Sequence, residues 1–99
     1  MVQISWSNIA IADLKAIKEY IARDSPRFAR IQLQKIRDRV TVLKKNPEAG
    51  KQNTESEDPA IRELVEGNYR IIYEVVAKDR IHILLVHHGA RDINQRLKK

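Results

Sequence analysis

The sequence contains no cysteine among its 99 residues. Without a thiol, the chain cannot form disulfide bonds, thiolate metal sites or a cysteine nucleophile. This composition suits a reducing compartment. Aromatic residues are also scarce, at 5% of the chain, so aliphatic side chains must fill most of the core.

Long apolar stretches are missing as well. No run approaches the roughly 20 residues that a membrane-spanning helix needs. The opening Met-Val-Gln-Ile-Ser-Trp has neither a basic region nor a long apolar segment, so it does not resemble a signal peptide. We therefore expect a soluble, cytoplasmic protein that does not associate with membranes.

The length and composition indicate a folded chain. A domain usually takes about 100–200 residues, so we expect a single domain over residues 1–99. Apolar residues make up 42% and charged residues 32% of the sequence, which is typical of a globular rather than a disordered chain.

The net charge of +6 is unevenly distributed along the chain. Residues 23–45 carry eight basic and two acidic side chains, whereas residues 51–79 carry four basic and seven acidic ones. Residues 80–99 are basic again, with five basic side chains and one acidic. Such a basic stripe attracts phosphates or an acidic protein, although a solvated helix face is an equally good interpretation of residues 23–45.

The first half of the chain predicts one strand and two helices. Residues 2–6 alternate as a short strand does, and Ser7 is a plausible N-cap for a helix over 8–23. The apolar stripe of that helix consists of Ala10, Leu14, Ile17 and Ile21. Ser25 and Pro26 then mark the start of a second helix over 26–45. Its stripe is the cleanest periodicity in the sequence: Ala29, Leu33, Ile36, Val40 and Leu43.

The second half predicts a sheet. Residues 47–59 form a polar segment that we expect to be a mobile loop. Three β-rich segments follow, over 60–65, 69–77 and 80–87, joined by turns that favour two consecutive hairpins. Asp92 is a plausible cap for a last short turn, in which Ile93 and Leu97 share one face. The predicted fold class is α+β, with a two-helix hairpin packed on a small antiparallel sheet in the order β-α-α-β-β-β.

Common catalytic patterns are missing. There is no glycine-rich phosphate loop and no His-Glu-x-x-His motif. His87 and His88 are adjacent, so on a strand they would point to opposite faces and could not chelate one metal ion. We therefore expect no metal site and no cofactor.

Basic side chains are predicted to gather at one end of the sheet. The start of one strand lies beside the end of the next in a hairpin, so Arg70 should neighbour His87 or His88. The complete set of candidates for binding a phosphate or a target is Arg62, Arg70, His87, His88 and Arg91. Guanidinium groups beside an imidazole can hold a phosphodiester and move a proton, or they can pair with carboxylates of a partner. The alternative is ordinary ion pairing, for instance of Arg70 or Arg91 with Glu66 or Asp92.

Two tyrosines fall on one face of the strand over 69–77. Tyr69 and Tyr73 alternate with Ile71, which predicts that both rings pack in the core. Their hydroxyl groups are expected at its rim.

Several ordered segments resemble the ParE/RelE superfamily of toxins. The opening resembles the family in Ile4-Ser5-Trp6-Ser7, Ala10, Asp13-Leu14, Ile17 and Tyr20-Ile21. Leu43, Pro47 and Gly50 resemble its helix exit, and the closing strands do so in Asn68-Tyr69-Arg70-Ile71-Ile72-Tyr73 and His88-Gly89-Ala90-Arg91-Asp92. The resemblance implies a helical hairpin on an antiparallel sheet and the toxin half of a type II toxin–antitoxin module, which stabilises plasmids or inhibits growth. It also implies a cognate antitoxin as partner in a hetero-oligomer, covering apolar surface that the toxin alone exposes.

The superfamily divides by target, and the resemblance leaves three alternatives. RelE-like members cut mRNA on the ribosome, whereas ParE-like members are not nucleases and poison DNA gyrase. The RelE-type arginines match Arg70 and Arg91, but its lysine pair falls on Ile61 and Glu63, and its C-terminal tyrosine falls on Leu97. We therefore favour a gyrase poison without enzymatic activity. The alternatives are a ribosome-dependent mRNA endoribonuclease using Arg70, His88 and Arg91, and a toxin fold that has lost toxicity and only binds its partner.

Overall fold

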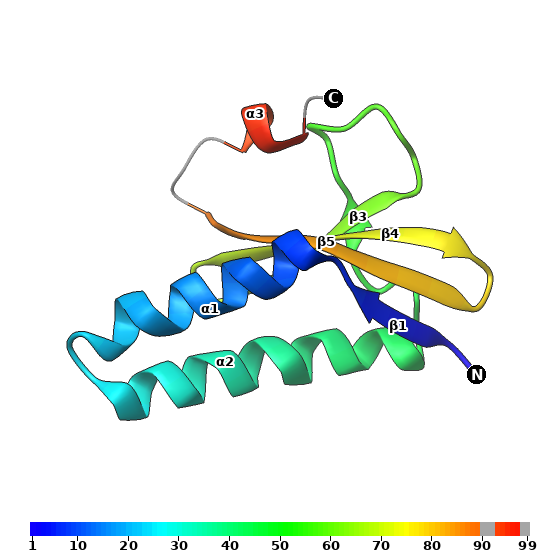
Figure 1. The fold of residues 1–99 in the computed structure, drawn as a ribbon. Helices are drawn as coiled ribbons and strands as arrows, with labels where there is room; N and C mark the ends of the chain where they lie inside the picture. The colour runs from blue at the N-terminus through cyan, green and yellow to red at the C-terminus, as the bar shows by residue number, and fades with distance from the viewer. Residues whose placement is uncertain (90–92, 98–99) are drawn as a thin grey trace.

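The computed structural model describes residues 1–89 and 93–97 (Figure 1). Its order is strand, helix, helix and then further strands, which confirms the predicted fold class. The elements are β1 (Gln3–Trp6), α1 (Asn8–Ala22), α2 (Pro26–Thr41), the 3-10 turn η1 (Val42–Lys44), β2 (Lys51–Gln52), β3 (Ile61–Glu66), β4 (Tyr69–Ala77), β5 (Arg80–His88) and α3 (Asn94–Leu97).

The helices begin where their capping residues predict. The Ser7 hydroxyl accepts a hydrogen bond from the backbone N–H of Ala10 at 2.9 Å, and Ser25 does the same for Phe28 at 3.1 Å. The second helix is α-helical only to Thr41, whereas the sequence predicts it to residue 45. Its last turn tightens into η1 before Pro47, as helix ends often do.

The sheet has five strands in the order β1-β5-β4-β3-β2. Its β3-β4-β5 meander is antiparallel, as predicted, but β1 runs parallel to β5. The chain allows this because the helical hairpin and the meander separate β1 from β5, so no tight turn has to join them. β2 was not predicted; it is a two-residue strand inside the segment expected to be a loop, and it pairs with β3.

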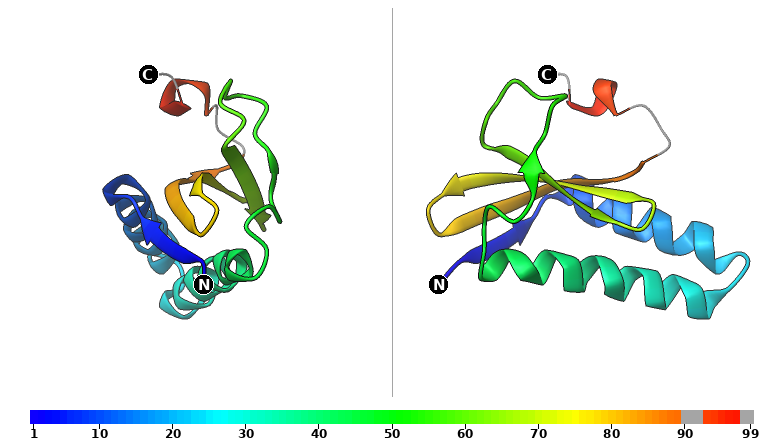
Figure 2. Two further views of the ribbon diagram at one scale, coloured as in Figure 1. Left: turned by 90° about the vertical axis from the view of Figure 1, so that its right-hand side faces the viewer. Right: turned by 180° about the vertical axis from the view of Figure 1, so that it is seen from behind.

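The two long helices cover one face of the sheet, and α3 lies on the other side (Figure 2). The apolar stripe of α2 is buried along its whole length, as its periodicity predicts. Together with the near face of the sheet it forms the main core, which consists of Ala10, Leu14, Leu33, Ile36, Val40, Leu43, Leu64, Tyr69, Ile71, Tyr73, Ile81, Ile83 and Val86.

A second, smaller core lies on the far face of the sheet. Ile61, Ile72 and Leu85 are buried there beneath Ile93, and Leu97 packs against them. Ile93 and Leu97 therefore share one face, as predicted for the last short turn. The expected capping residue Asp92 lies outside the described residues.

The segment over 47–59 is anchored to the sheet rather than a plain loop. Tyr73 lies in the main core, and its hydroxyl accepts a hydrogen bond from Gly50 N at 2.9 Å and donates to Pro47 O at 3.0 Å. The prediction that this hydroxyl lies at the rim is wrong, because the segment folds over it. Burial raises the pKa of Tyr73 above its ordinary value.

Candidate functional site

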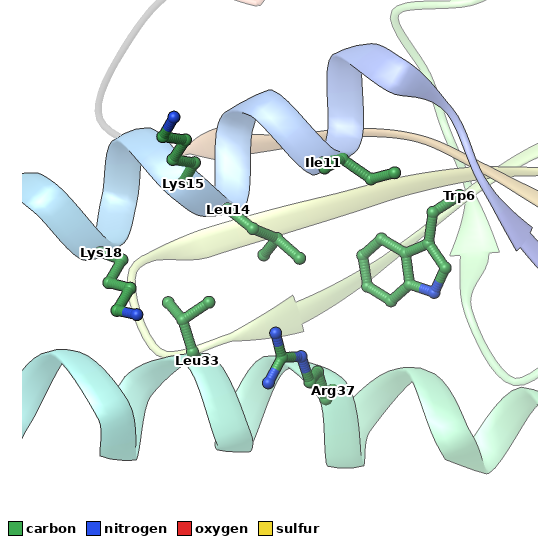
Figure 3. Close-up of a pocket in the computed structure, with 7 residues that line it drawn as sticks. All are labelled: Trp6, Ile11, Leu14, Lys15, Lys18, Leu33 and Arg37. Atoms are coloured by element: carbon green, nitrogen blue, oxygen red, sulfur yellow. The ribbon is translucent and has the colours of Figure 1, made fainter.

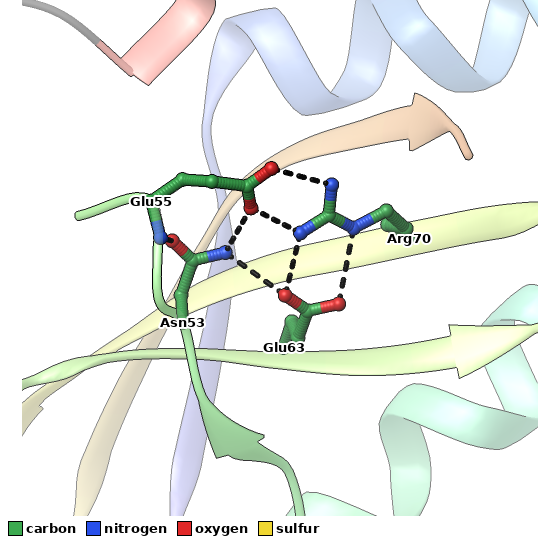
Figure 4. A network of polar contacts seen from close by, with 4 residues as sticks. All are labelled: Asn53, Glu55, Glu63 and Arg70. Carbon is green, nitrogen blue, oxygen red and sulfur yellow. Dashed lines mark hydrogen bonds and ion pairs between the residues drawn. The ribbon is translucent and has the colours of Figure 1, made fainter. Parts of the chain in front are cut away.

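Two carboxylates hold Arg70 on the face of the sheet that points away from the long helices (Figure 4). Its Nε donates to Glu63 Oε2 at 3.0 Å, and its Nη2 donates to Glu63 Oε1 at 2.7 Å. Its Nη1 donates to Glu55 Oε2 at 3.1 Å, and its Nη2 also donates to Glu55 Oε1. Asn53 Nδ2 completes the cluster by donating to Glu63 Oε1 at 2.9 Å.

The cluster is largely shielded from water. The side chain of Glu63 is 4% exposed, that of Arg70 19% and that of Glu55 28%. Hydrogen bonds from Arg70 hold the pKa of Glu55 below its ordinary value, and both carboxylates raise the pKa of Arg70. Glu55 and Arg70 are therefore both charged at neutral pH. The cluster places two carboxyl groups against a single guanidinium.

The prediction that Arg70 pairs with Glu66 is wrong. Glu66 pairs with Tyr69 across the β3–β4 ladder, so it leaves the sheet on the helix side, opposite to Arg70. Asp92 lies outside the described residues. Glu55 was missed because nothing in the local sequence links it to an arginine 15 positions away.

Arg62 is not part of this cluster, contrary to the prediction. The register pairs Arg62 with Tyr73, whose ring lies in the helix-side core, so Arg62 and Arg70 leave the sheet on opposite faces. Arg62 Nη1 donates to Gly50 O at 2.6 Å, and its Nη2 lies 3.8 Å from Glu48 Oε1. The two guanidinium groups therefore cannot hold the same phosphate in this arrangement.

His87 lies opposite Arg70 in the β4–β5 ladder, which confirms the predicted adjacency. The residue is 5% exposed, and its Nδ1 lies 3.1 Å from Arg96 Nη1. Arg96 Nη2 also donates to both carboxylate oxygens of Asp13, each at 2.8 Å. His87 thus belongs to a set of contacts that joins β5, α3 and α1.

Asp13 has a further role that the sequence did not indicate. β1 ends at Trp6, opposite Ile83, so the edge of β5 continues beyond it. The Asp13 carboxylate accepts a hydrogen bond from Val86 N at 2.9 Å, and the Ser7 hydroxyl donates to Leu84 O at 2.6 Å. The side chains of Ser7 and Asp13 therefore satisfy backbone hydrogen-bonding groups of β5 along the part of its edge that β1 does not cover.

His88 points to the opposite face from His87, as predicted. Its ring lies edge-on against that of Tyr69, with centroids 5.5 Å apart and planes at 89°. Arg91, the remaining member of the predicted set, lies outside the described residues. The structure therefore brings Arg70 and His87 together and separates Arg62 and His88 from them.

An apolar groove with a cavity volume of about 430 Å³ opens between α1 and α2 (Figure 3). Leu14 and Leu33 face each other across it, and the indole of Trp6 closes one end. Lys18 and Arg37 extend into the gap from opposite helices. Ile11 and Lys15 complete the lining. An apolar floor with a cationic rim is complementary to an amphipathic segment with acidic flanks.

Metal-ligating side chains do not gather within the described ranges 1–89 and 93–97. No group of three or more His, Asp or Glu residues there is placed to hold a metal ion. In the same ranges, no helix has the length and apolar character needed to cross a membrane.

Comparison with known proteins identifies the family. Residues 4–93 match the model of the family described as "ParE toxin of type II toxin-antitoxin system, parDE". The chain is 34% identical over 91 residues to "Toxin RelE2" of Caulobacter vibrioides, covering 92% of this chain and 99% of that protein. A solved structure titled "Chromosomal ParDE TA system from P. aeruginosa" is also similar, with a TM-score of 0.70, 27% identity and coverage of 89% of this chain and 96% of that one. The chain belongs to the ParE toxin family of type II toxin–antitoxin systems.

Proposed function

We propose that the chain inhibits growth by binding DNA gyrase and poisoning it, and that it does not cut RNA. The observation that supports this most is the pair of carboxylates on Arg70. A phosphodiester would have to displace a glutamate from the guanidinium and would then lie beside negative charge. Electrostatic stabilisation of a developing negative charge requires the opposite arrangement.

The neighbouring positions support the same proposal. Where the resemblance places a lysine pair in RelE-type nucleases, this chain has the buried apolar side chain of Ile61 and the buried carboxylate of Glu63. Where it places a tyrosine, Leu97 packs on the second core. These substitutions remove two cations that could stabilise developing negative charge and a phenol that could transfer a proton.

The second candidate function is ribosome-dependent mRNA cleavage by Arg70, His88 and Arg91. The observation in its favour is the relative named Toxin RelE2, at 34% identity. His88 is half-buried near the end of β5, and histidine is the side chain that most often transfers protons in catalysis.

We propose a cognate antitoxin as the partner and the cytoplasm as the location. The groove between α1 and α2 suits an amphipathic antitoxin helix, with apolar anchors over Leu14 and Leu33 and acidic residues near Lys18 and Arg37. Its binding would give a hetero-oligomer in which the exposed apolar side chains of the groove are covered.

The distinguishing experiment is a brief induction of the chain in cells, followed by analysis of DNA and mRNA from the same culture. We expect broken DNA to accumulate while mRNA remains intact. The variants His87→Ala and His88→Ala should remain toxic where they remain folded, because a binding poison needs no proton transfer. Transcript cleavage on the ribosome that disappears with a single histidine would instead establish the nuclease. Neither kind of damage, from a folded chain, would indicate a toxin fold that only binds its partner.

A further inference from the structure

We propose that a basic stripe on the helical hairpin binds the phosphate backbone of duplex DNA, so that the toxin contacts the DNA held by gyrase as well as the enzyme. The basic stripe consists of Arg27, Arg30 and Arg37 of α2 together with Lys15 and Lys18 of α1. The inference rests on the proposed gyrase target for its biological setting, but DNA binding can be measured without gyrase.

The stripe follows one face of α2. Positions 27, 30, 34, 37 and 41 recur at the three- and four-residue spacing that aligns side chains along a helix. All five are exposed: Arg27, Arg30, Gln34, Arg37 and Thr41. The Thr41 hydroxyl donates to Arg37 O at 3.0 Å and the Gln34 amide donates to Asp38 at 2.8 Å, so the arginines are the main donors that the row offers to a ligand. At 1.5 Å per residue the row is about 21 Å long. One strand of duplex DNA carries about six phosphates over that distance.

The charges of the stripe are not balanced within the described part of the chain. There, none of its five cations has a carboxylate within 4.0 Å. Asp13 binds Arg96 and the edge of β5, and Asp38 accepts a hydrogen bond from Gln34 at 2.8 Å. Lys18 and Arg37 approach the same gap from two helices, so their mutual repulsion is relieved when an anion binds.

The chemistry of the row favours nucleic acid over a protein partner. Beyond the groove, the row presents Arg27 and Arg30, and arginine is one of the side chains that contact phosphate. The centre of a protein–protein interface is usually apolar and poor in charge. Three of the five stripe cations, Lys15, Lys18 and Arg37, also line the apolar groove. An antitoxin helix in the groove and a DNA backbone on the stripe would therefore compete for them.

The test is fluorescence anisotropy of the full chain with a labelled duplex of about 20 base pairs, from about 50 to 200 mM salt. Five phosphate contacts predict a plot of log K against log salt with a slope of about −4.5. The double variant Arg30→Gln/Arg37→Gln should lower the magnitude of that slope by about 2 and weaken binding by at least about tenfold near 0.1 M salt. The variant Arg30→Lys/Arg37→Lys keeps both charges and should retain most of the affinity.

The matched control is Lys51→Gln/Lys78→Gln, which removes two exposed cations far from the stripe in the sequence, on β2 and in the β4–β5 turn. If this control weakens duplex binding as much as Arg30→Gln/Arg37→Gln does, only net charge matters and the proposal that the stripe binds DNA is wrong. Absence of duplex binding at 50 mM salt would also overturn it. Tighter binding to single-stranded RNA of the same length would contradict the choice of duplex DNA.

The two proposals can fail separately. If DNA breaks in cells but the purified chain does not bind the duplex, the proposed DNA-binding role of the stripe is wrong and the proposed gyrase target is still supported. Duplex binding that localises to the stripe, together with intact DNA in cells, would refute the gyrase target and leave the stripe standing.

Discussion

Glu63 occupies a position where the RelE-type pattern has a lysine. Its buried carboxylate binds Arg70, which Glu55 also binds. This single difference reverses the local charge. An arginine that could hold a phosphate beside lysines instead becomes the centre of a structural ion cluster. A buried charge of this kind is costly to leave without a partner, so we expect Arg70 to serve the stability of the fold.

The variant Arg70→Met should destabilise the protein by about 2–3 kcal/mol, because it leaves the buried Glu63 carboxylate with Asn53 as its remaining donor in the cluster. Glu55→Gln should cost no more than about 1 kcal/mol, since the Glu55 side chain is partly exposed. Urea unfolding of both variants measures the difference. An Arg70→Met protein as stable as the parent but without toxicity would show that Arg70 serves the target instead.

The contribution of Glu55 should depend on pH. Its pKa is lowered in the folded chain, chiefly by the hydrogen bonds from Arg70, so its stabilising contribution is complete at neutral pH. That contribution declines as pH falls below 4.5, the ordinary value, and is lost once the folded carboxyl protonates. The gap in unfolding free energy between the parent and Glu55→Gln should therefore close in acid. Glu57→Gln removes an exposed carboxylate from the same loop and corrects for the change in net charge; a gap that is constant with pH would contradict the assignment.

The segment between α2 and β3 connects the two sides of the molecule. It starts near the helix end at Pro47, passes through β2 and brings Asn53 and Glu55 to the far face of the sheet. It packs tightly against the sheet at Gly50, where a Cβ atom would lie 2.5 Å from Glu63 O and 2.7 Å from the Tyr73 hydroxyl oxygen. Such distances require a backbone shift, so glycine is needed for steric reasons.

Gly50→Ala should therefore destabilise the chain by about 1–3 kcal/mol through overpacking against β3 and β4. The neighbouring exposed change Ala49→Ser should alter stability by less than about 0.5 kcal/mol. Thermal unfolding of the two variants tests this. Equal stability of Gly50→Ala and the parent would mean that the segment is not held against the sheet in solution.

The molecule as a whole divides its charge between two sides of the sheet. The hairpin presents the cationic stripe and the apolar groove, whereas the far face carries the Arg70 cluster and the second core. Figure 2 shows the two long helices and α3 on opposite sides of the sheet. Binding partners that recognise positive charge should therefore use the hairpin. The net charge of +6 thus coexists with Arg70, whose charge is already paired with carboxylates on the far face.

Affinity for the cognate antitoxin should fall as ionic strength rises, because charge pairs at the rim of the groove are screened by salt. Calorimetric titration between about 50 mM and 500 mM salt measures this dependence. Lys18→Gln/Arg37→Gln should flatten it, while Lys51→Gln/Lys78→Gln should not. Affinity that is constant over the whole range would exclude an electrostatic contribution from the groove.

Local patterns in the sequence were sufficient for much of the fold. The apolar stripes predicted both helices, and the β-rich segments predicted the meander, since burial of one face imposes a period on each element. Hairpin geometry also predicted that Arg70 lies beside His87 or His88, and the register places it opposite His87. The resemblance to the toxin superfamily predicted the family to which the chain belongs.

The partners of the charged side chains depended on contacts between distant segments. Side chains alternate between the two faces of a strand, so the strand register decides on which face Arg62 or Glu66 lies. A register shift of one residue would move each side chain to the opposite face. The path of the segment over 47–59 placed Glu55 on Arg70, and the β1–β5 pairing joined the two ends of the fold. These outcomes come from packing the whole chain, because side chains far apart in the sequence meet only after the helices, the sheet and the loop have taken their places together.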